Sequence, residues 1–393
     1  MATKKSLYIW QQPNWPSLTL DYQRAGPALA DARRMEGEVR GKAAAIGLAP
    51  DGQVARSVME AEVIATAAIE GERLDPVAVR SSVGRQLGLK VPGAVDRSVD
   101  GLVEVINDAV HGCDAPLDED RLHRWQSALF PNGTSGIRRI AVGRYRDHAE
   151  PMQIVSGSLG KEVVHYEAPP SKQVGKEMKR FVAWFAKTTP TVGLRPAIDG
   201  LARAAIAHLW FESIHPFEDG NGRIGRAIVD MALAQDLRTD IKLYSLSRQL
   251  LASRREYYDA LNAAQRGDGD ATDWVIWFAR QYTRACESSS EVIDAVLDKA
   301  RFWAAHAGLQ LNDRQRKVLQ RLLDDGDGGF LGGLNADKYT KIAGTSKPTA
   351  TRDLADLVRA GVLWSQGQGK ALRYYVNVPG WTHGVDRALQ TVR

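Results

Sequence analysis

The sequence predicts a mainly α-helical protein with a β-hairpin near its middle, a helical region at its N-terminus and a winged helix-turn-helix domain at its C-terminus. Apolar residues recur three and four positions apart through most of the first 300 residues, which is the period of an amphipathic helix. Two short β-prone runs flank a Ser-Gly-Ser-Leu-Gly turn within residues 152–166. Residues 312–380 have the order of a winged helix, three helices followed by two strands.

Composition limits the class of protein. The 393 residues allow two or three domains, and 44% hydrophobic with 25% charged residues is typical of a globular protein. No apolar run approaches the roughly 20 residues that a membrane helix needs, and the first 16 residues lack the apolar stretch of a secretory signal. Cys113 and Cys286 are too few for a disulfide framework or a cysteine metal site. We therefore expect a cytoplasmic protein with no membrane partner.

The N-terminal region, residues 1–100, is expected to combine an extended arm with helices. Two prolines exclude a helix interior within residues 7–21. Helical spacing of apolar residues predicts two helices, over residues 27–48 and 53–69. Gly71 followed by Pro76 is expected to end the second helix.

The central domain, residues 101–300, is expected to be helical apart from the hairpin and a turn-rich stretch at 131–147. Its helices are expected at residues 101–109, 119–129, 172–188, 195–213, 223–235, 247–265 and 273–300. A linker at 301–311, the winged helix at 312–380 and a tail at 381–393 are expected to follow.

The stretch HPFEDGNGRIGR, residues 215–226, lies at the corner between two predicted helices. Gly220 and Gly222 allow a tight turn and a close approach of a ligand to the backbone, and the unpaired N–H groups at the start of the second helix attract anions. Arg223 and Arg226 share a face of that helix. Two cations in a first turn oppose the helix dipole, by about 0.3 to 1 kcal/mol each, which indicates a polyanionic ligand such as a triphosphate.

The same stretch contains an acid and a histidine. Asp219 would repel a polyanion unless a cation lay between them, and Mg²⁺ held by one carboxylate and phosphates is the ordinary arrangement. His215 is one turn away and can accept a proton near neutral pH. Phosphates, magnesium and a base together indicate phosphoryl or nucleotidyl transfer. The stretch lacks the spacing of an EF-hand, and no P-loop motif occurs in the sequence.

At these residues the sequence resembles the Fic family, whose signature H-x-F-x-[D/E]-G-N-G-R-x-x-R is matched at every specified position. GRYR at 143–146, HYEAPP after the hairpin and SRREYYDALNAAQRGDGDATDW at 253–274 also resemble landmarks of that family. The WQQPNWP arm at 10–16 resembles an N-terminal domain that often accompanies it.

The resemblance implies transfer of AMP from ATP to a Ser, Thr or Tyr hydroxyl of a target protein, and of the chain itself. It implies His215 as the base and Asp219 as the Mg²⁺ ligand. It assigns the phosphates to Gly220, Asn221, Gly222, Arg223 and Arg226, the adenosine pocket to Tyr257, Tyr258 and Gln265, and a flap that pairs with the target backbone to Ile154, Val155, Ser156 and Gly157. For the two tyrosines a role in the core is an equal alternative.

A second match concerns regulation. TAAIEG at 66–71 fits the family's inhibitory pattern [S/T]-x-x-x-E-[G/N]. Thr66 and Glu70 lie one turn apart, and a carboxylate at the end of a helix that Gly71 terminates favours a cationic partner. The resemblance implies that this partner is Arg226 and that the pair blocks productive seating of the γ-phosphate. The same glutamate has an alternative role in positioning water for removal of AMP.

The C-terminal domain is expected to bind double-stranded DNA. Ser346 is expected to cap a helix that exposes Lys347, Thr349, Thr351 and Arg352, with Lys370 and Arg373 on the wing. The net charge of +5 is compatible with a polyanion. Winged helices also serve as protein-binding modules. The alternatives to an adenylyltransferase are therefore a DNA-binding regulator whose Fic core senses nucleotide, or a Fic enzyme that transfers another phosphate-containing group. The sequence leaves open whether the chain forms a homo-oligomer.

Overall fold

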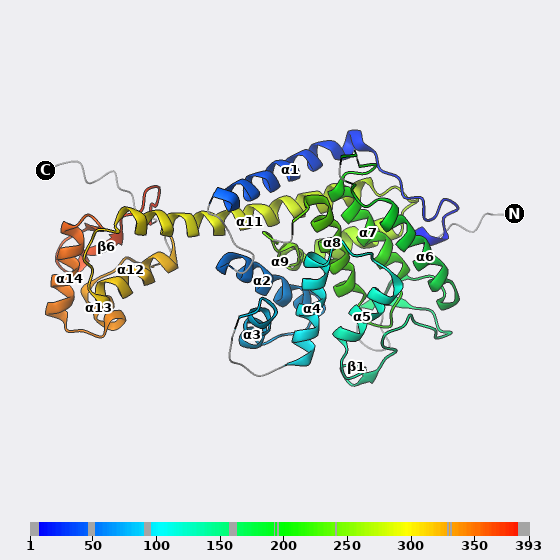
Figure 1. Cartoon of the computed structure of the whole chain (residues 1–393), viewed down its shortest axis with the longest axis horizontal. Coiled ribbons are helices and arrows are strands. Elements are labelled where there is room, and N and C mark those ends of the chain that lie inside the picture. The colour runs from blue at the N-terminus through cyan, green and yellow to red at the C-terminus, as the bar shows by residue number, and fades with distance from the viewer. Residues whose placement is uncertain are drawn as a thin grey trace. The chain divides into compact units, whose positions relative to one another are not determined.

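The computed structural model describes residues 8–45, 52–89, 96–156, 163–191, 193–194, 196–239, 242–327, 330 and 332–383. Figure 1 shows that helices dominate these residues, and the strands among them form two-stranded antiparallel sheets. The chain divides into two compact units, Met1–Ser290 and Glu291–Arg393. The mainly helical fold predicted from the sequence is confirmed.

The first unit begins with an irregular arm and continues through helices. Its N-terminal elements are η1 (Ile9–Gln11), α1 (Tyr22–Ala45), α2 (Gln53–Ile69), α3 (Pro76–Gln86), α4 (Arg97–His111) and α5 (Glu119–Leu129). Helix α1 begins five residues before the predicted start at Pro27, because Asp21 Oδ1 accepts hydrogen bonds from the backbone N–H groups of Gln23 and Arg24, at 2.8 and 3.3 Å. Residues 46–48 of the predicted helix lie outside the described residues.

Helix α3 was not predicted, since Pro76 was interpreted as part of a helix end. The Asp75 side chain accepts a hydrogen bond from Val77 N at 2.9 Å, and Pro76 occupies the first turn. The N–H groups of the first turn have no partner within a helix, so a proline at that position loses no hydrogen bond. Gly71, with φ of 84°, does end α2, as expected.

The rest of the first unit surrounds one apolar helix. It contains β1 (Thr134–Ser135), β2 (Arg138–Arg139), β3 (Gln153–Ser156), β4 (Val163–Glu167), α6 (Ser171–Lys187), α7 (Gly200–Ile214), α8 (Asn221–Leu237), α9 (Leu246–Ala252), α10 (Arg254–Gln265) and α11 (Thr272–Ala305). Every residue of α7 is buried, and α8 packs against α7 and α4. This packing fixes the corner between α7 and α8.

Two local features of this region differ from the sequence prediction. The predicted helix over 247–265 is two helices, with a break at Ser253, whose backbone (φ −109°, ψ 31°) departs from helical geometry. The short pair β1 and β2 lies within the stretch expected to be turns. The predicted hairpin is confirmed as β3 and β4, which pair antiparallel.

The second unit has the predicted order of elements. It contains the end of α11, then α12 (Asp313–Asp325), α13 (Ala336–Ala343), α14 (Lys347–Arg359), β5 (Leu363–Gln366), η2 (Gly369–Ala371) and β6 (Arg373–Val376). The division of the chain at Ser290 differs from the expected linker at 301–311, because α11 continues to Ala305 and Phe302 is buried in the core of this unit. Trp381, placed in the tail by the sequence, is buried in the same core.

No helix among the described residues is both long enough and apolar enough to cross a membrane.

Candidate active site

The predicted catalytic histidine lies at the end of α7 in an unusual backbone conformation. His215 caps the helix with φ of 50° and ψ of 61°, and its N–H donates to Phe211 O at 2.9 Å. The buried Arg146, from the GRYR landmark, donates to the carbonyl oxygens of His215 at 2.8 Å and Ile214 at 3.2 Å. Burial lowers the pKa of Arg146 to about 10. These contacts stabilise the left-handed backbone of His215, a conformation that costs free energy in a residue other than glycine.

The loop between α7 and α8 is closed by its own side chains. Asn221 Oδ1 accepts from Phe217 N at 2.9 Å, and Asn221 Nδ2 donates to Phe217 O at 2.8 Å. Gly220 has φ of 89°, and a Cβ there would lie 2.9 Å from the Phe130 ring. The side chain of Asn221, expected to contact phosphates, is therefore used to fix the loop. What this loop offers an anion is the start of α8.

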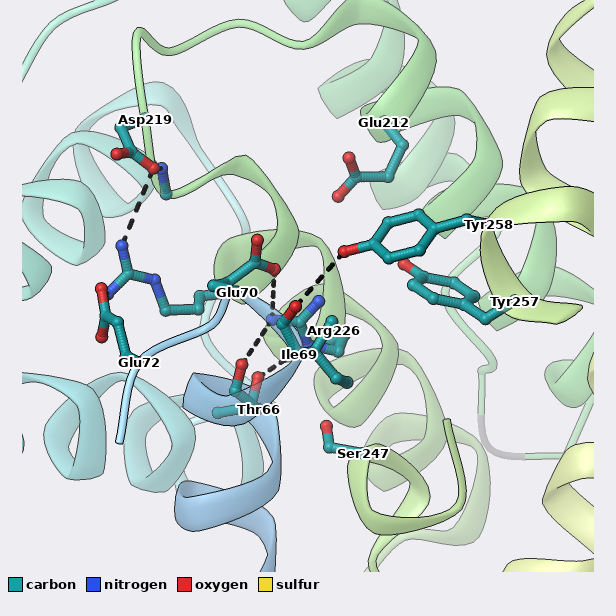
Figure 2. Close-up of polar contacts among 12 residues, drawn as sticks. Thr66, Ile69, Glu70, Glu72, Glu212, Asp219, Arg226, Ser247, Tyr257 and Tyr258 are labelled. Atoms are coloured by element: carbon teal, nitrogen blue, oxygen red, sulfur yellow. Dashed lines mark hydrogen bonds and ion pairs between the residues drawn. The ribbon is translucent and has the colours of Figure 1, made fainter. Parts of the chain in front are cut away.

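The second motif arginine is held by the end of α2. Arg226 Nη2 donates to Glu70 Oε1 at 2.8 Å and to Thr66 O at 3.0 Å, and Nε donates to Thr66 Oγ1 at 2.7 Å, as Figure 2 shows. Burial lowers the pKa of Arg226, but the charge and hydrogen bond of Glu70, together with Tyr257 and Tyr258, outweigh burial, so the pKa lies above the ordinary value. The pair expected from the inhibitory pattern is thus present as a close contact.

The first arginine of the motif, Arg223, forms an ion pair with a different acid, Glu72. Arg223 Nη1 lies 3.1 and 3.2 Å from the two carboxylate oxygens of Glu72, and its guanidinium lies 4.9 Å from the centre of the Phe130 ring. Nη2 of Arg223 lies 3.8 Å from Asp219 Oδ1. Glu72 was not predicted to contact this arginine, although an acid two residues after Glu70 could have indicated a second partner.

The end of α2 explains how two nearby acids reach two arginines. Gly71 N–H donates to Ala68 O and Glu72 N–H donates to Ala67 O, both at 3.0 Å. These are the hydrogen bonds of a Schellman motif with glycine in the left-handed position. Glu70 therefore stands on one side of the glycine and Glu72 on the other, each beside its arginine.

Asp219 is the residue predicted to hold Mg²⁺. Its side chain is 41% exposed; Oδ1 accepts from Gly220 N at 2.5 Å, and Oδ2 accepts from the Ser135 hydroxyl. The described residues contain no group of three or more His, Cys, Asp or Glu side chains that could form a cage for a metal. A single accessible carboxylate beside an anion site fits Mg²⁺, which commonly binds one or two carboxylates together with substrate phosphates.

A cavity of about 500 Å³ opens at this corner. Its lining includes most of the predicted groups: Glu70, Ile154, Val155, His215, Gly222, Arg226, Tyr257, Tyr258 and Gln265. The lining also includes residues that the sequence analysis did not name: His165, Glu212, Arg254, Arg255, Asp259, Leu261 and Asn262. The other predicted residues, Thr66, Gly71, Ser156, Asp219, Gly220, Asn221 and Arg223, are not among its lining residues. Gly157 lies outside the described residues.

The two tyrosines differ in their surroundings. Tyr257 is 1% exposed, its hydroxyl lies 2.7 Å from His208 Nε2, and burial raises its pKa. The Tyr258 hydroxyl donates to Ile69 O at 3.4 Å, at the last residue of α2. Tyr257 therefore serves the core as well as the cavity wall, and Tyr258 reaches the end of α2.

Glu212 is a buried acid that sequence reasoning missed. It lies one turn before His215, with Oε2 3.7 Å from His215 Nδ1. Burial would raise the pKa of Glu212, but its interaction with His215 and the charges of neighbouring groups lower it below the ordinary value. The signal available in the sequence was a single acid in the largely apolar α7, three residues before the motif histidine.

The residues expected to contact DNA lie in the second unit. Ser346 occupies the N-cap of α14 without a side-chain capping bond and instead contacts the Thr349 hydroxyl at 3.0 Å. Lys347 Nζ lies 2.8 Å from an Asp337 carboxylate oxygen. Thr351 donates to Lys347 O at 3.0 Å. Arg373 donates to the carbonyl oxygens of Lys370 and Leu372, both at 2.9 Å, while Arg352 and Lys370 are exposed.

Comparison with known proteins identifies two segments. Residues 116–233 match the Fic/DOC family, and residues 8–89 match a domain of unknown function, DUF4172. The chain is 29% identical over 119 residues to a uridine 5'-monophosphate transferase of Xanthomonas campestris, and 30% identical over 133 residues to the protein adenylyltransferase Fic of Nematostella vectensis. The matches cover 30% and 34% of this chain but only 21% and 28% of those relatives.

A solved structure shares the fold over nearly the whole chain. A Fic family protein from Desulfovibrio desulfuricans superimposes with a TM-score of 0.51 at 20% sequence identity, covering 92% of this chain and 98% of that one.

Proposed function

Since residues 116–233 belong to the Fic/DOC family, we propose that this protein transfers AMP from ATP to Ser, Thr or Tyr hydroxyls of a target protein and of itself. The observation that carries this proposal is the α7–α8 corner, where His215 and the start of α8 meet at one cavity with Arg226 in its wall. A base next to a cationic anion site is what nucleotidyl transfer to an alcohol needs.

The reaction can be written with these residues. The target hydroxyl oxygen forms a bond to the α-phosphorus of ATP, the bond from that phosphorus to the oxygen bridging the β-phosphate breaks, and pyrophosphate leaves. His215 accepts the hydroxyl proton. Arg223, Arg226 and the first turn of α8 bind the phosphates and stabilise charge as it moves to the leaving group. Asp219 would hold Mg²⁺, which supplies further charge neutralisation at the phosphates when bound.

We propose that the enzyme is autoinhibited by Glu70. The guanidinium of Arg226 is already bonded to Glu70 and Thr66, so a γ-phosphate that needs this arginine must displace the carboxylate. A hydrogen bond to a charged group contributes roughly 1.5–3 kcal/mol, so Glu70→Gly is expected to raise AMP transfer by about 10-fold or more.

Radioactive ATP tests both proposals. Label at the α-phosphate should become covalently attached to protein with the wild type, more strongly with Glu70→Gly and not with His215→Ala. Label attached only from the γ-phosphate would show phosphorylation instead. Nucleotide binding without covalent label in any variant would favour the alternative of a DNA-binding regulator that senses nucleotide.

Two further activities share this site. A similarity to a uridine 5'-monophosphate transferase makes α-labelled UTP the first alternative donor to compare with ATP. The same Glu70 carboxylate is suited to position water for removal of AMP; loss of label from pre-modified target with the wild type, but not with Glu70→Gly, would support that role.

We propose that β3 and β4 form the flap that aligns the target. Ile154 and Val155 line the cavity, and Val155 and Val163 are 47% and 58% exposed. An exposed strand pairs readily with an extended peptide. Val155→Pro should lower labelling of the target while leaving the affinity for ATP unchanged; equal labelling would exclude strand pairing at this position.

We also propose that residues 291–393 form a winged helix that binds double-stranded DNA, as an activity separate from AMP transfer. The three helices followed by β5 and β6 support this, together with the exposed Arg352 and Lys370.

A further inference from the structure

Glu212 is a carboxylate at the active site that the proposed reaction does not use. Its side chain is 7% exposed, and its Oε2 lies 3.7 Å from Nδ1 of His215. Within the described residues, Glu212 Oε1 and His215 Nδ1 are both buried without a hydrogen-bond partner. The distance is longer than a hydrogen bond, and catalytic contacts in a site without substrate are commonly long and shorten when substrate binds.

The helix opposite makes room for this carboxylate. Gly225 of α8 faces Glu212, and a Cβ at that position would lie 2.5 Å from Glu212 Oε1 and 3.1 Å from His208 Nδ1. Real Cβ atoms do not approach an oxygen that closely, so an alanine at 225 would force the acid to move. The glycine between the two motif arginines is therefore explained by the position of Glu212.

The charges around Glu212 identify its partner. A buried carboxylate needs a cation or hydrogen-bond donors. Arg226 donates to Glu70 and Thr66. Burial lowers the pKa of His208, so this ring is neutral at neutral pH, and its Nε2 contacts the Tyr257 hydroxyl. His208 Nδ1 is also buried without a hydrogen-bond partner among the described residues, but it is Nδ1 of His215 that lies 3.7 Å from the Glu212 carboxylate. The contact with the carboxylate therefore selects His215 as the partner.

We propose that Glu212 is a positioning residue that accepts the Nδ1–H of His215 and so leaves Nε2 of the imidazole as the proton acceptor for the target hydroxyl. The hydrogen bond made by one ring nitrogen of a histidine decides which nitrogen carries the proton. This inference rests on the proposed AMP transfer, and it assigns a role to a residue outside the signature sequence.

Kinetics of the full chain in the Glu70→Gly background test the proposal. Glu212→Leu should lower kcat by about 10- to 100-fold with the KM for ATP changed less than twofold, and Glu212→Gln, which keeps an acceptor oxygen, should lower it less. Glu177→Leu is the matched control, because Glu177 is a carboxylate of α6 whose side chain is 8% exposed and contacts Trp15 and Arg180. An unchanged kcat in Glu212→Leu, or equal losses of kcat and melting temperature in both variants, would overturn the proposal.

The imidazole itself gives a readout that needs no turnover. Nitrogen-15 chemical shifts of the ring, assigned by the signals missing from His215→Ala, should show a proton on Nδ1 in the wild type and a shift toward Nε2 in Glu212→Leu. The same tautomer in both proteins would overturn the proposal. If Glu70→Gly transferred no AMP at all, the proposed function would fail, and the ring nitrogens would still decide the role of Glu212.

Discussion

Arg223 and Arg226 are both occupied by acids from the end of α2. Arg226 is 4% exposed and its partner Glu70 is 31% exposed, whereas Arg223 is 5% exposed and its partner Glu72 is 46% exposed. The more an ion pair is exposed to water, the less it contributes. In the proposed autoinhibition, Glu70 is therefore the stronger obstacle to the nucleotide, and Glu72 is a weaker one at Arg223.

Glu72→Gln should raise AMP transfer by roughly 1.4-fold to fivefold, because a pair with one exposed partner contributes about 0.2–1 kcal/mol. The increase should add to that of Glu70→Gly when the two are combined, as measured by α-labelled ATP at subsaturating nucleotide. Glu104→Gln, at an exposed position of α4, is the control. Lower transfer in Glu72→Gln than in the control would contradict the assignment.

The sequence predicted the residues whose roles are encoded in short motifs. Thr66, Glu70, His215 and Arg226 were named, and the contacts among the first two and Arg226 are present. Glu72 and Glu212 were missed for a physical reason: each gains its meaning from a partner fixed by folding. The partner of Glu72 is Arg223, which lies 151 positions away in the sequence. The carboxylate of Glu212 has room beside His215 only because the facing helix carries a glycine, Gly225.

At the scale of elements, the Schellman motif at the end of α2 depends on the left-handed backbone of Gly71. Gly71→Ala should raise AMP transfer and loosen the helix end, since a left-handed residue with a Cβ costs roughly 1–2 kcal/mol. Apart from its chain neighbours, no atom of the described residues lies within 4 Å of the added Cβ, so backbone strain is the expected cause of the change. Gly71→Asn is the matched variant, because asparagine tolerates this conformation, and it should stay inhibited. Equal activity of the two variants would exclude the mechanism.

Helix α2 is also fixed to α8 by a buried cluster of charges. Lys242 Nζ contacts Asp230 of α8 and lies 3.4 Å from Glu62 of α2, while Glu62 accepts hydrogen bonds from the Ser245 and Ser247 hydroxyls. With all three groups ionised, the cluster would hold an excess negative charge away from water. Burial and the nearby Glu62 raise the pKa of Asp230 to about 7, although Lys242 and Arg226 oppose the shift.

The contribution of Asp230 to stability should therefore fall as pH rises from about 4 to about 7. In the unfolded chain an aspartate is ionised above about 3.9, whereas folded Asp230 keeps its proton up to about 7. The folded state then holds one more proton in this window, and each pH unit costs at most about 1.4 kcal/mol. Urea unfolding at pH 5 and pH 7 should show a smaller pH dependence in Asp230→Asn than in the wild type or in Asp259→Asn, an exposed control. The same dependence of unfolding free energy on pH in all three proteins would contradict the raised pKa of Asp230.

Most elements followed from periodicity, and the exceptions have local causes. Helices α2 and α5 have the predicted bounds, because apolar spacing and capping signals agree there. The break between α9 and α10 has no glycine or proline, and Ser253 contacts Gln281 of α11, a long-range contact that periodicity cannot reveal. Helix α3 could have been predicted, since Asp75 followed by Pro76 is a start signal as well as a stop.

At the scale of the whole molecule, most of the net positive charge lies in residues 291–393, the second unit. Binding to phosphates releases counterions, so affinity for DNA falls with salt by a slope of about 0.9 per phosphate contact. Arg352→Ala should weaken binding of a random-sequence duplex and reduce this slope by about one, measured by fluorescence anisotropy from 50 to 200 mM salt. The exposed Lys179→Ala of the first unit is the control. No binding of the full chain at low salt would discard the DNA proposal.

The glycine between Glu70 and Glu72 has a consequence for signalling. The two acids are neighbours on one short stretch of backbone, so unwinding the last turn of α2 withdraws both from their arginines in the same movement. Under the proposed autoinhibition, an activator that unwinds this turn would free both arginines at once, whereas ATP alone would have to compete with each acid separately.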